Sequence, residues 1–196
     1  MLPPLIILVL FCGSSSGLEA ASSDWPQFGR TPSFQSFKNV SNPAHPPHAE
    51  WTWSKDAVGA AVDRLVASPA VFNGTVYLGS DSGHLYALDQ RTGDLKWTFE
   101  QHCMPSHSEK CGGNGIRSSP AVFEDGSVVF GSYDTNVYKV SADGALQWYF
   151  KAGGSIYCPA TIDQDGSVLI GTSGENCLYS LDGATGSLNW RSCGDA

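Results

Sequence analysis

The stretch ALDQRTGDLKW, residues 87–97, decides the fold because most of it returns later in the chain. Residues 180–190 read SLDGATGSLNW, with Leu-Asp, Thr-Gly, Leu and Trp at the same offsets. A pattern Asp-x-x-Thr-Gly-x-x-x-Trp that occurs twice either performs chemistry at that spacing or belongs to a repeated structural unit. Self-similarity at a fixed period is typical of repeat architectures, so the residues around the two copies decide between these interpretations.

Three blocks of the chain share the same order of apolar runs and turns. They are residues 68–100, 119–151 and 158–191. In each block a Pro-Ala pair opens a short apolar strand, and a turn such as Asn73-Gly74 or Asp125-Gly126 follows. A β-rich run comes next (TVYLGS, SVVFGS or SVLIGT), then a second turn, a third strand, a third turn and a strand with Trp. Asn-Gly and Asp-Gly are strong hairpin signals. Each block therefore predicts four short antiparallel strands and leaves no room for a helix.

The spacing of the blocks predicts the architecture. Pro69 and Pro120 are 51 residues apart, whereas Pro120 and Pro159 are 39 apart, and the extra length falls in an insertion at residues 101–115. A four-stranded unit of about 40 residues that stacks on copies of itself is a β-propeller blade. The predicted fold is all-β, a propeller of four-stranded antiparallel blades at about residues 66–100, 116–151 and 156–191. One extra strand at Glu50–Lys55, EWTWSK, resembles the last strand of a blade.

The blocks resemble the repeats of quinoprotein alcohol dehydrogenases and related pyrroloquinoline quinone (PQQ)-like propellers, whose pattern is Ala-x-Asp-x-x-Thr-Gly-x-x-x-Trp. The first block matches at Ala87, Asp89, Thr92, Gly93 and Trp97. The third matches at Asp182, Thr185, Gly186 and Trp190, with Ser180 in place of Ala, and the second keeps Gly144 and Trp148. The stretch DWPQFGRTP, residues 24–32, also resembles a segment that often precedes such propellers. This resemblance is specific for fold and much less so for activity.

The motif residues are interpreted as structural, and no residue is predicted to be catalytic. An Asp at a turn accepts hydrogen bonds from backbone amides two or three residues later, and Gly accepts the positive φ that the turn needs. A Trp side chain buries on the order of 200 Å² and can seal one blade against the next. The resemblance implies the same role, because in that family this Trp docks onto the adjacent blade.

The N-terminus predicts export. Residues 1–12, MLPPLIILVLFC, form an apolar run that is followed by small residues and is too short to cross a bilayer. We interpret residues 1–20 as a secretory signal peptide, with cleavage after Gly17, Ala20 or Ala21, residues 21–49 as a lead-in segment and residues 50–196 as the propeller. The predicted location is extracellular or the lumen of the secretory pathway, or the periplasm if the source is bacterial.

Export favours disulfides, and Cys103 and Cys111, which flank a short loop, are the predicted pair. Five cysteines follow the signal, and the odd count leaves a free thiol, an intermolecular bridge or a partner on a missing part of the chain. The insertion also holds the zinc-ligand types His102, Cys103, His107 and Cys111, but their spacing matches no common finger and a disulfide would consume both thiolates. The candidate glycosylation sites are Asn39 and Asn73, each in an N-x-S/T sequon.

Composition limits the partners. The net charge is −8 with scattered acidic residues, which argues against nucleic acid because phosphate binding needs a basic face. No membrane span is predicted.

Propellers have about four to eight blades, so three blades and one strand predict a partial propeller. Further C-terminal blades would complete it, or self-association into a closed ring would.

Function stays open between three hypotheses. The first is a secreted or luminal PQQ-like propeller that acts as a binding or scaffold module for an unidentified protein or small molecule, with no assured cofactor. Families that it resembles include the outer-membrane assembly lipoprotein and the luminal sensors of unfolded-protein stress. The second is a fragment of a PQQ-dependent alcohol or sugar dehydrogenase, and only this alternative implies PQQ with calcium. The third is the luminal sensor domain of a longer membrane protein.

Overall fold

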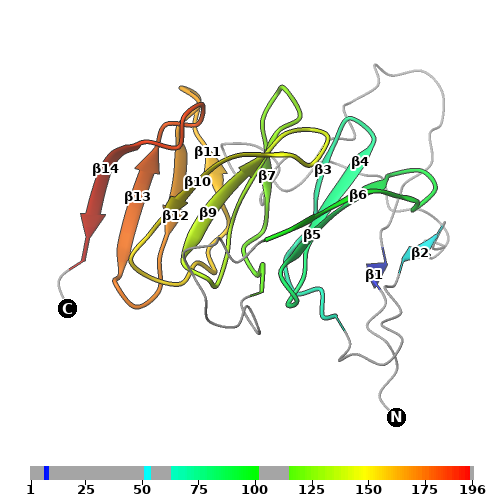
Figure 1. The fold of residues 1–196 in the computed structure, drawn as a ribbon, viewed down its shortest axis with the longest axis horizontal. Coiled ribbons are helices and arrows are strands. Elements are labelled where there is room, and N and C mark those ends of the chain that lie inside the picture. Colours follow the sequence, from blue (N-terminus) through cyan, green and yellow to red (C-terminus); the bar gives the residue numbers. More distant parts are fainter. Residues whose placement is uncertain (1–6, 9–50, 54–62, 102–114, 195–196) are drawn as a thin grey trace, which may run out of the picture.

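The computed structural model describes residues 7–8, 51–53, 63–101 and 115–194 (Figure 1). Within these ranges the chain forms strands and turns and contains no helix. Three four-stranded antiparallel sheets follow one another, and each runs in sequence order from its first strand to its fourth. The predicted all-β class and the four-stranded antiparallel blade are confirmed.

The strands of each blade are short. Blade 1 consists of β3 (Ala70–Phe72), β4 (Thr75–Gly79), β5 (His84–Asp89) and β6 (Leu95–Glu100). Blade 2 consists of β7 (Ala121–Val122), β8 (Val128–Gly131), β9 (Asn136–Val140) and β10 (Leu146–Lys151). Blade 3 consists of β11 (Thr161–Ile162), β12 (Val168–Gly171), β13 (Cys177–Leu181) and β14 (Leu188–Cys193).

A small two-stranded sheet precedes the blades. Its β2 (Thr52–Trp53) lies inside the extra strand predicted at Glu50–Lys55, and it pairs antiparallel with β1 (Ile7–Leu8). In that pairing Ile7 lies opposite Trp53. Strand β1 falls inside the predicted signal segment 1–20, whereas the lead-in segment 21–49 lies outside the described residues.

Turn chemistry explains why the chain reverses where it does. Asn73 and Gly74 connect β3 to β4 with φ of +44° and +71°. Positive φ at both central residues is the requirement of a two-residue hairpin turn that matches the twist of its strands. Because Asn and Gly tolerate this conformation better than other residues, the Asn-Gly pair fixes the register, in which Phe72 lies opposite Thr75.

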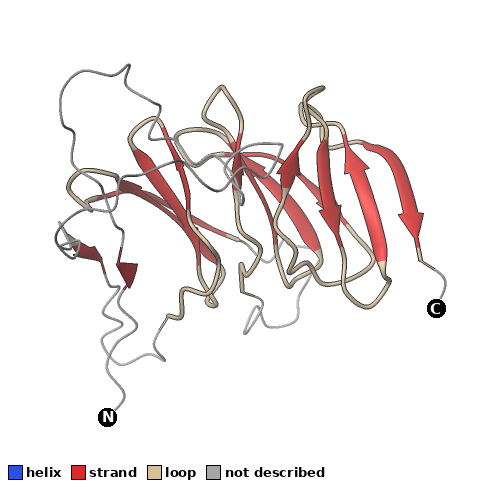
Figure 2. Ribbon diagram, turned by 180° about the vertical axis from the view of Figure 1, so that it is seen from behind, coloured by secondary structure: helices blue, strands red, loops and turns tan. Residues whose placement is uncertain are grey.

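The core lies between the blades rather than inside any one of them, because alternate residues of a strand point to opposite faces of its sheet. Figure 2 shows the three sheets side by side in a row. Between blades 1 and 2 the ring of Phe99 contacts Phe130 and Tyr138 at centroid distances of 5.9 and 6.0 Å. A second cluster joins blades 2 and 3, and a third covers the outer face of blade 1 with Trp51, Trp53 and Leu65.

One buried position between blades 2 and 3 carries a charge. Lys139 on β9 is only 6% exposed, and its Nζ donates a hydrogen bond of 2.9 Å to the Gly183 carbonyl. The same ammonium lies 4.1 Å from the centre of the Phe123 ring. Burial lowers the pKa of Lys139, while Asp125 and Asp182 act in the opposite direction. These contacts satisfy the buried cation as part of the interface.

Candidate functional site

The two full copies of the repeated motif form the same capped turn. Asp89 Oδ1 accepts hydrogen bonds from the backbone N–H groups of Arg91 and Thr92 at 2.9 and 3.0 Å. Asp182 Oδ1 accepts the equivalent bonds from Ala184 and Thr185 at 3.0 and 2.7 Å. The backbone N–H of Thr92 is the largest cause of the lowered pKa of Asp89, and that of Thr185 has the same effect on Asp182. Both carboxylates are engaged by their own turns.

The motif turn of one blade receives the tryptophan of the preceding unit. Trp51 Nε1 donates to the Gln90 carbonyl at 3.0 Å, Trp97 Nε1 to Ala142 at 2.9 Å and Trp148 Nε1 to Gly183 at 3.1 Å. Each indole lies over the turn glycine. A Cβ atom would lie 2.7 Å from the Trp51 ring at Gly93, 2.8 Å from the Trp97 ring at Gly144 and 2.7 Å from the Trp148 ring at Gly186. These glycines are therefore needed for the close approach of a ring as well as for their positive φ.

Blade 2 forms this turn without the Asp and Thr of the motif. Ser141 stands at the Asp position, and its Oγ accepts a hydrogen bond of 3.0 Å from the Ala145 N–H. The same hydroxyl donates to the Asp143 carboxylate. Ser141 therefore caps the shortened turn, and Gly144 still accepts the Trp97 ring. The docking contact tolerates the loss of both motif side chains because a carbonyl and a glycine are enough for it.

A tyrosine on the third strand of every blade donates its hydroxyl to a carboxylate. The pairs are Tyr86 with Asp63, Tyr138 with Asp134 and Tyr179 with Glu175. Burial is the largest cause of the raised pKa of Tyr86 and Tyr138, and the paired carboxylate adds to it. Tyr86 and Tyr138 therefore stay protonated as donors at physiological pH. The three carboxylates lie at one end of the blades, and each accepts the hydroxyl hydrogen of its tyrosine.

At that same end, four side chains from successive loops form a continuous surface, which we call the loop-end patch: Asp81, Arg117, Tyr133 and Tyr157. The Arg117 guanidinium bonds Asp81 at 2.7 Å and lies 5.7 Å from the centre of the Tyr133 ring. The Tyr133 and Tyr157 rings meet edge to face at 5.3 Å. The neighbouring Tyr133 hydroxyl raises the pKa of Tyr157. Sequence reasoning missed this patch, because it depends on which loops become neighbours.

The backbone holds the loop-end patch in place. The Tyr133 N–H donates to the Gly115 carbonyl at 3.1 Å, and the Tyr133 carbonyl accepts a bond from the Ser155 hydroxyl at 3.0 Å. Arg64 lies on the other side of Asp81 at 3.8 Å. Tyr133 and Tyr157 are nevertheless 38% and 40% exposed. The patch thus combines fixed positions with accessible aromatic surface.

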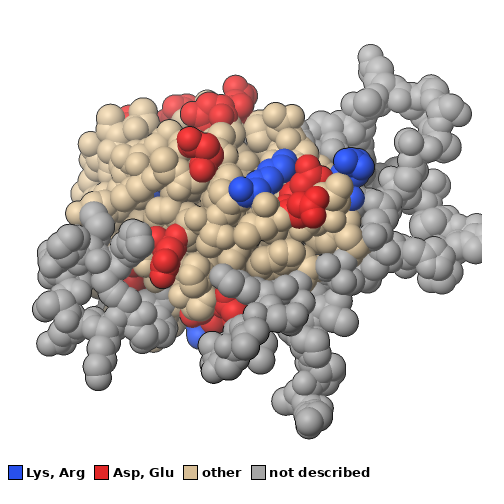
Figure 3. Space-filling view, turned by 45° about the vertical axis from the view of Figure 1, so that its right-hand side comes forward, with Lys and Arg blue, Asp and Glu red and all other residues tan. Residues whose placement is uncertain are grey.

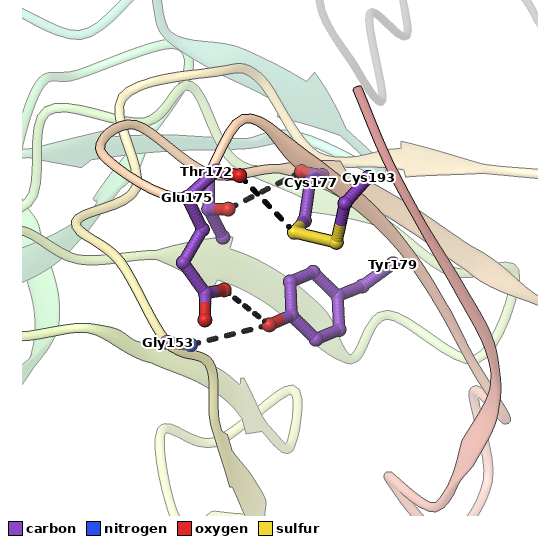
Figure 4. The surroundings of a disulfide bond; sticks show 6 residues. All are labelled: Gly153, Thr172, Glu175, Cys177, Tyr179 and Cys193. Carbon is purple, nitrogen blue, oxygen red and sulfur yellow. Dashed lines mark hydrogen bonds between the residues drawn. A yellow bond between two sulfur atoms is a disulfide. The ribbon is translucent and has the colours of Figure 1, made fainter. Parts of the chain in front are cut away.

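The outer edge of blade 3 carries a disulfide between Cys177 and Cys193 (Figure 4). The two residues lie directly opposite in the pairing of β13 with β14. The equivalent pairs are His84 with Glu100 in blade 1 and Asn136 with Lys151 in blade 2. Sequence analysis did not predict this bond, although an alignment of the third and fourth strands would have placed the two cysteines together. Cys158 is a free, exposed thiol.

The other predicted cysteine pair and the candidate metal ligands lie outside the described residues. This holds for the Cys103–Cys111 pair, for the cluster His102, Cys103, His107 and Cys111, and for the glycosylation candidate Asn39. Asn73 is described and stands exposed in the β3–β4 turn. Within the described ranges, no group of three or more His, Cys, Asp or Glu side chains is placed to hold a metal ion.

Charge is dispersed on the face that Figure 3 shows. In the view of Figure 3, acidic side chains form several separate groups, and basic side chains lie beside some of them. Among the described residues there is no helix long and apolar enough to cross a membrane.

Successive four-stranded blades joined by a tryptophan and a glycine turn define a PQQ-like β-propeller. The chain belongs to the family whose model (PQQ_2) is described as outer membrane protein assembly factor BamB and matches residues 47–148. The prediction of a PQQ-like repeat family is therefore confirmed.

Two curated relatives match most of this chain but share little of their own length with it. The serine/threonine-protein kinase AfsK of Streptomyces griseus is 30% identical over 149 residues, which cover 74% of this chain and 18% of the kinase. The dehydrogenase subunit of a quinone alcohol dehydrogenase of Gluconobacter oxydans is 25% identical over 214 aligned residues, 93% of this chain and 27% of that protein. The chain thus spans about a quarter or less of these relatives.

Solved structures agree on the fold. BamB from Moraxella catarrhalis superposes with a TM-score of 0.57 at 22% identity, over 74% of this chain and 43% of BamB. The quinohemoprotein alcohol dehydrogenase ADHIIG from Pseudomonas putida HK5 gives a TM-score of 0.65 at 22% identity, over 86% of this chain and 26% of the enzyme. The same blade arrangement occurs in an assembly factor and in an enzyme, so the fold alone does not assign an activity.

Proposed function

We propose that this chain is part of a secreted or luminal PQQ-like propeller that acts as a binding or scaffold module, and that its loop-end patch contacts a protein partner. The observation that carries this proposal is the patch itself, in which Arg117, Tyr133 and Tyr157 are ordered and exposed together. Tyr and Arg are enriched among the residues that contribute most to protein–protein binding. Family membership supports a protein partner, since the family is described as an assembly factor.

The geometry of the patch favours binding because its side chains are already held in place before a partner binds. Arg117 is held by Asp81 at 2.7 Å, and Tyr133 is held through its backbone on both sides. Association normally costs about 0.5–1.5 kcal/mol for each flexible side chain that becomes immobilised. Tyr has few rotatable bonds, so it supplies contact area at a low entropic cost. The fixed aromatic surface is therefore suited to recognition.

Export is supported by the apolar N-terminal run and by the Cys177–Cys193 bond, since disulfides persist in oxidising compartments. The proposal expects the secreted product to begin after Gly17, Ala20 or Ala21. N-terminal sequencing of protein expressed through the secretory pathway of a eukaryotic host checks this. A product that stays in the cytosol with Met1 intact contradicts export without affecting the proposed binding role.

The binding role is tested with a displayed library of random 12-residue peptides selected on the full chain. Peptides that bind the native protein should lose at least tenfold in affinity for a Tyr133→Ala/Tyr157→Ala variant. They should keep their affinity for Tyr149→Ala, because Tyr149 is 46% exposed on the outer strand β10, away from the loop ends. A library that yields no binders, or binders that ignore the patch variant, overturns the role assigned to this surface.

A second candidate is a fragment of a PQQ-dependent dehydrogenase, and the similarity to the Gluconobacter oxydans enzyme over 93% of this chain favours it. The loop-end carboxylates Asp63, Asp134 and Glu175 each accept a tyrosine hydroxyl. No three metal-ligating side chains of the described residues lie together. Titration of the protein with PQQ and calcium, followed by dye reduction with ethanol, separates the two functions. Binding and turnover support the dehydrogenase, whereas the absence of both removes it.

A further inference from the structure

Blade 1 brings a serine, a histidine and a carboxylate together at the loop between β4 and β5. Ser82 Oγ lies 2.6 Å from His84 Nδ1, and His84 Nε2 lies 3.9 Å from Glu100 Oε1. His84 begins β5 and Glu100 ends β6, where the two residues lie opposite each other in the strand pairing. The three side chains therefore follow the order nucleophile, base and carboxylate, which activates a serine hydroxyl on unrelated folds.

Neighbouring groups fix the imidazole and the hydroxyl. The His84 ring stacks on Tyr86 at a centroid distance of 5.7 Å and an angle of 16°. Because Nε2 is the nitrogen beside the Glu100 carboxylate, we assign the ring hydrogen to Nε2, which leaves Nδ1 to accept the Ser82 hydroxyl. Ser80 Oγ donates to Ser82 Oγ at 3.0 Å and accepts the backbone N–H of His84 at 3.2 Å. The serine hydroxyl is thus held toward its base before a substrate arrives.

The other blades indicate that the fold does not require this arrangement. The equivalent places in blade 2 hold side chains of other chemistry: Asp134, Asn136 and Lys151. In blade 2 the loop carboxylate accepts the hydroxyl of the tyrosine on its own third strand. In blade 1 Asp63, which lies outside the loop, accepts the corresponding hydroxyl of Tyr86. A serine can therefore stand in the loop of blade 1 and bond to His84.

The surroundings of Ser82 limit the substrate that it can attack. Ser82 is exposed, so a small molecule can reach its hydroxyl from solvent. Its backbone N–H donates to Asp63 Oδ1 at 3.1 Å, and the Gly83 N–H donates to the Ser80 carbonyl at 3.2 Å. Neither amide is thus available to stabilise an oxyanion, and the loss of one such donor lowers a rate by about 10²–10³-fold. The site is therefore suited to esters with a stable leaving group and not to amides.

We propose that Ser82 and His84, with Glu100 as a positioning residue, form a nucleophilic site that accepts the acyl group of small activated esters. Ser82 Oγ bonds to the acyl carbon while its proton moves to His84 Nδ1. The bond from that carbon to the leaving oxygen breaks, and the leaving oxygen takes the proton from His84. Water then bonds to the acyl carbon, one of its protons returns through His84 to Ser82 Oγ, and the carboxylic acid departs. None of the three residues belongs to the loop-end patch, so this site goes beyond the proposed binding role.

The test treats the full chain with p-nitrophenyl acetate and locates the acetyl group by peptide mass spectrometry. Acetyl-Ser82 should accumulate with a burst of p-nitrophenol, because water must then displace the poorer leaving group Ser82 Oγ. Ser187 is the control within the same molecule, since it is exposed and accepts a hydrogen bond from the Thr185 hydroxyl instead of facing an imidazole. We expect Ser82 to be acetylated at least tenfold faster than Ser187. Equal rates at the two serines overturn the proposal without the need for any variant.

Variants then assign the roles. His84→Asn places in blade 1 the residue type that blade 2 has at Asn136, and it should slow acetylation of Ser82 at least tenfold with little change in Tm. Glu100→Gln should slow the reaction severalfold, and Glu100→Asp should restore most of the rate because it restores the negative charge. A rate that ignores His84→Asn overturns the role of the base. Cleavage of p-nitroacetanilide as fast as the ester overturns the assignment to activated esters.

Discussion

The indole ring of Trp148 fills the space in which a side chain on Gly186 would lie, since a Cβ there would stand 2.7 Å from the ring. The same indole donates to the Gly183 carbonyl, 35 residues away in sequence. One contact thus joins the fourth strand of blade 2 to the third turn of blade 3. Substitution of Trp148 and substitution of Gly186 test the two sides of this contact separately.

Removal of the docked ring should destabilise the protein strongly. Trp148→Ala is expected to lower the free energy of unfolding by about 3–5 kcal/mol, the range for a large aromatic side chain removed from a core. Trp190→Ala is the matched control, because the same residue type at the same register position is half exposed, and it should stay within about 0.5 kcal/mol. Chemical denaturation curves of both variants check this. Equal losses would mean that docking does not stabilise blade 2.

The turn glycines should be sensitive for two separate reasons. Gly186→Ala places a Cβ against the Trp148 ring and also strains a φ of +73°, whereas Gly166→Ala strains a φ of +82° with no atom within 4 Å. Positive φ alone costs about 1–2 kcal/mol, and overpacking adds about 1–3 kcal/mol. Gly186→Ala should therefore lower Tm by more than Gly166→Ala does. Equal shifts in thermal unfolding would attribute the whole effect to backbone conformation.

The disulfide should hold the outer strand of blade 3. Cys177→Ser/Cys193→Ser removes a link across 16 residues, for which loop entropy predicts a loss of about 3 kcal/mol. Because no residue of β14 is buried, we also expect its amide hydrogens to exchange faster than those of β13 in the variant. Cys158→Ser, which changes a free exposed thiol, is the control. Unchanged exchange in β14 would show that its pairing with β13 is sufficient.

Stability should fall in acid through the motif carboxylates. The pKa values of Asp89 and Asp182 are lowered by backbone N–H groups in the folded state, so the ionised form favours folding. This contribution is present above the unfolded pKa of about 4 and is lost as pH falls through the lower folded value. Tm should therefore drop between about pH 5 and pH 3, and less steeply in Asp89→Asn/Asp182→Asn. Glu124→Gln, on the exposed turn of blade 2, should keep the slope of the native protein.

Strand positions and turns could be predicted because their signals are local. Asn73-Gly74 carries the conformational requirement of its hairpin within two residues. The β-branched and aromatic residues of TVYLG favour a strand without any distant contact. The repeated spacing of Trp97 and Trp190 from their turns predicted equivalent places in two blades, and the structure gives them equivalent places. The Asp and Thr of the motif proved dispensable for docking, since Ser141 caps the corresponding turn of blade 2.

The sequence by itself determined the all-β class, the four-stranded unit and the residues that repeat in it. Only the tertiary structure decided which tryptophans are covered, which cysteines pair and which side chains form the loop-end patch. The Trp97 indole binds a carbonyl 45 residues away, and Arg117 reaches Asp81 across 36 residues. The physical reason is that a blade is specified by contacts within its own strands, whereas the exposure of its faces depends on the neighbour that stacks against it.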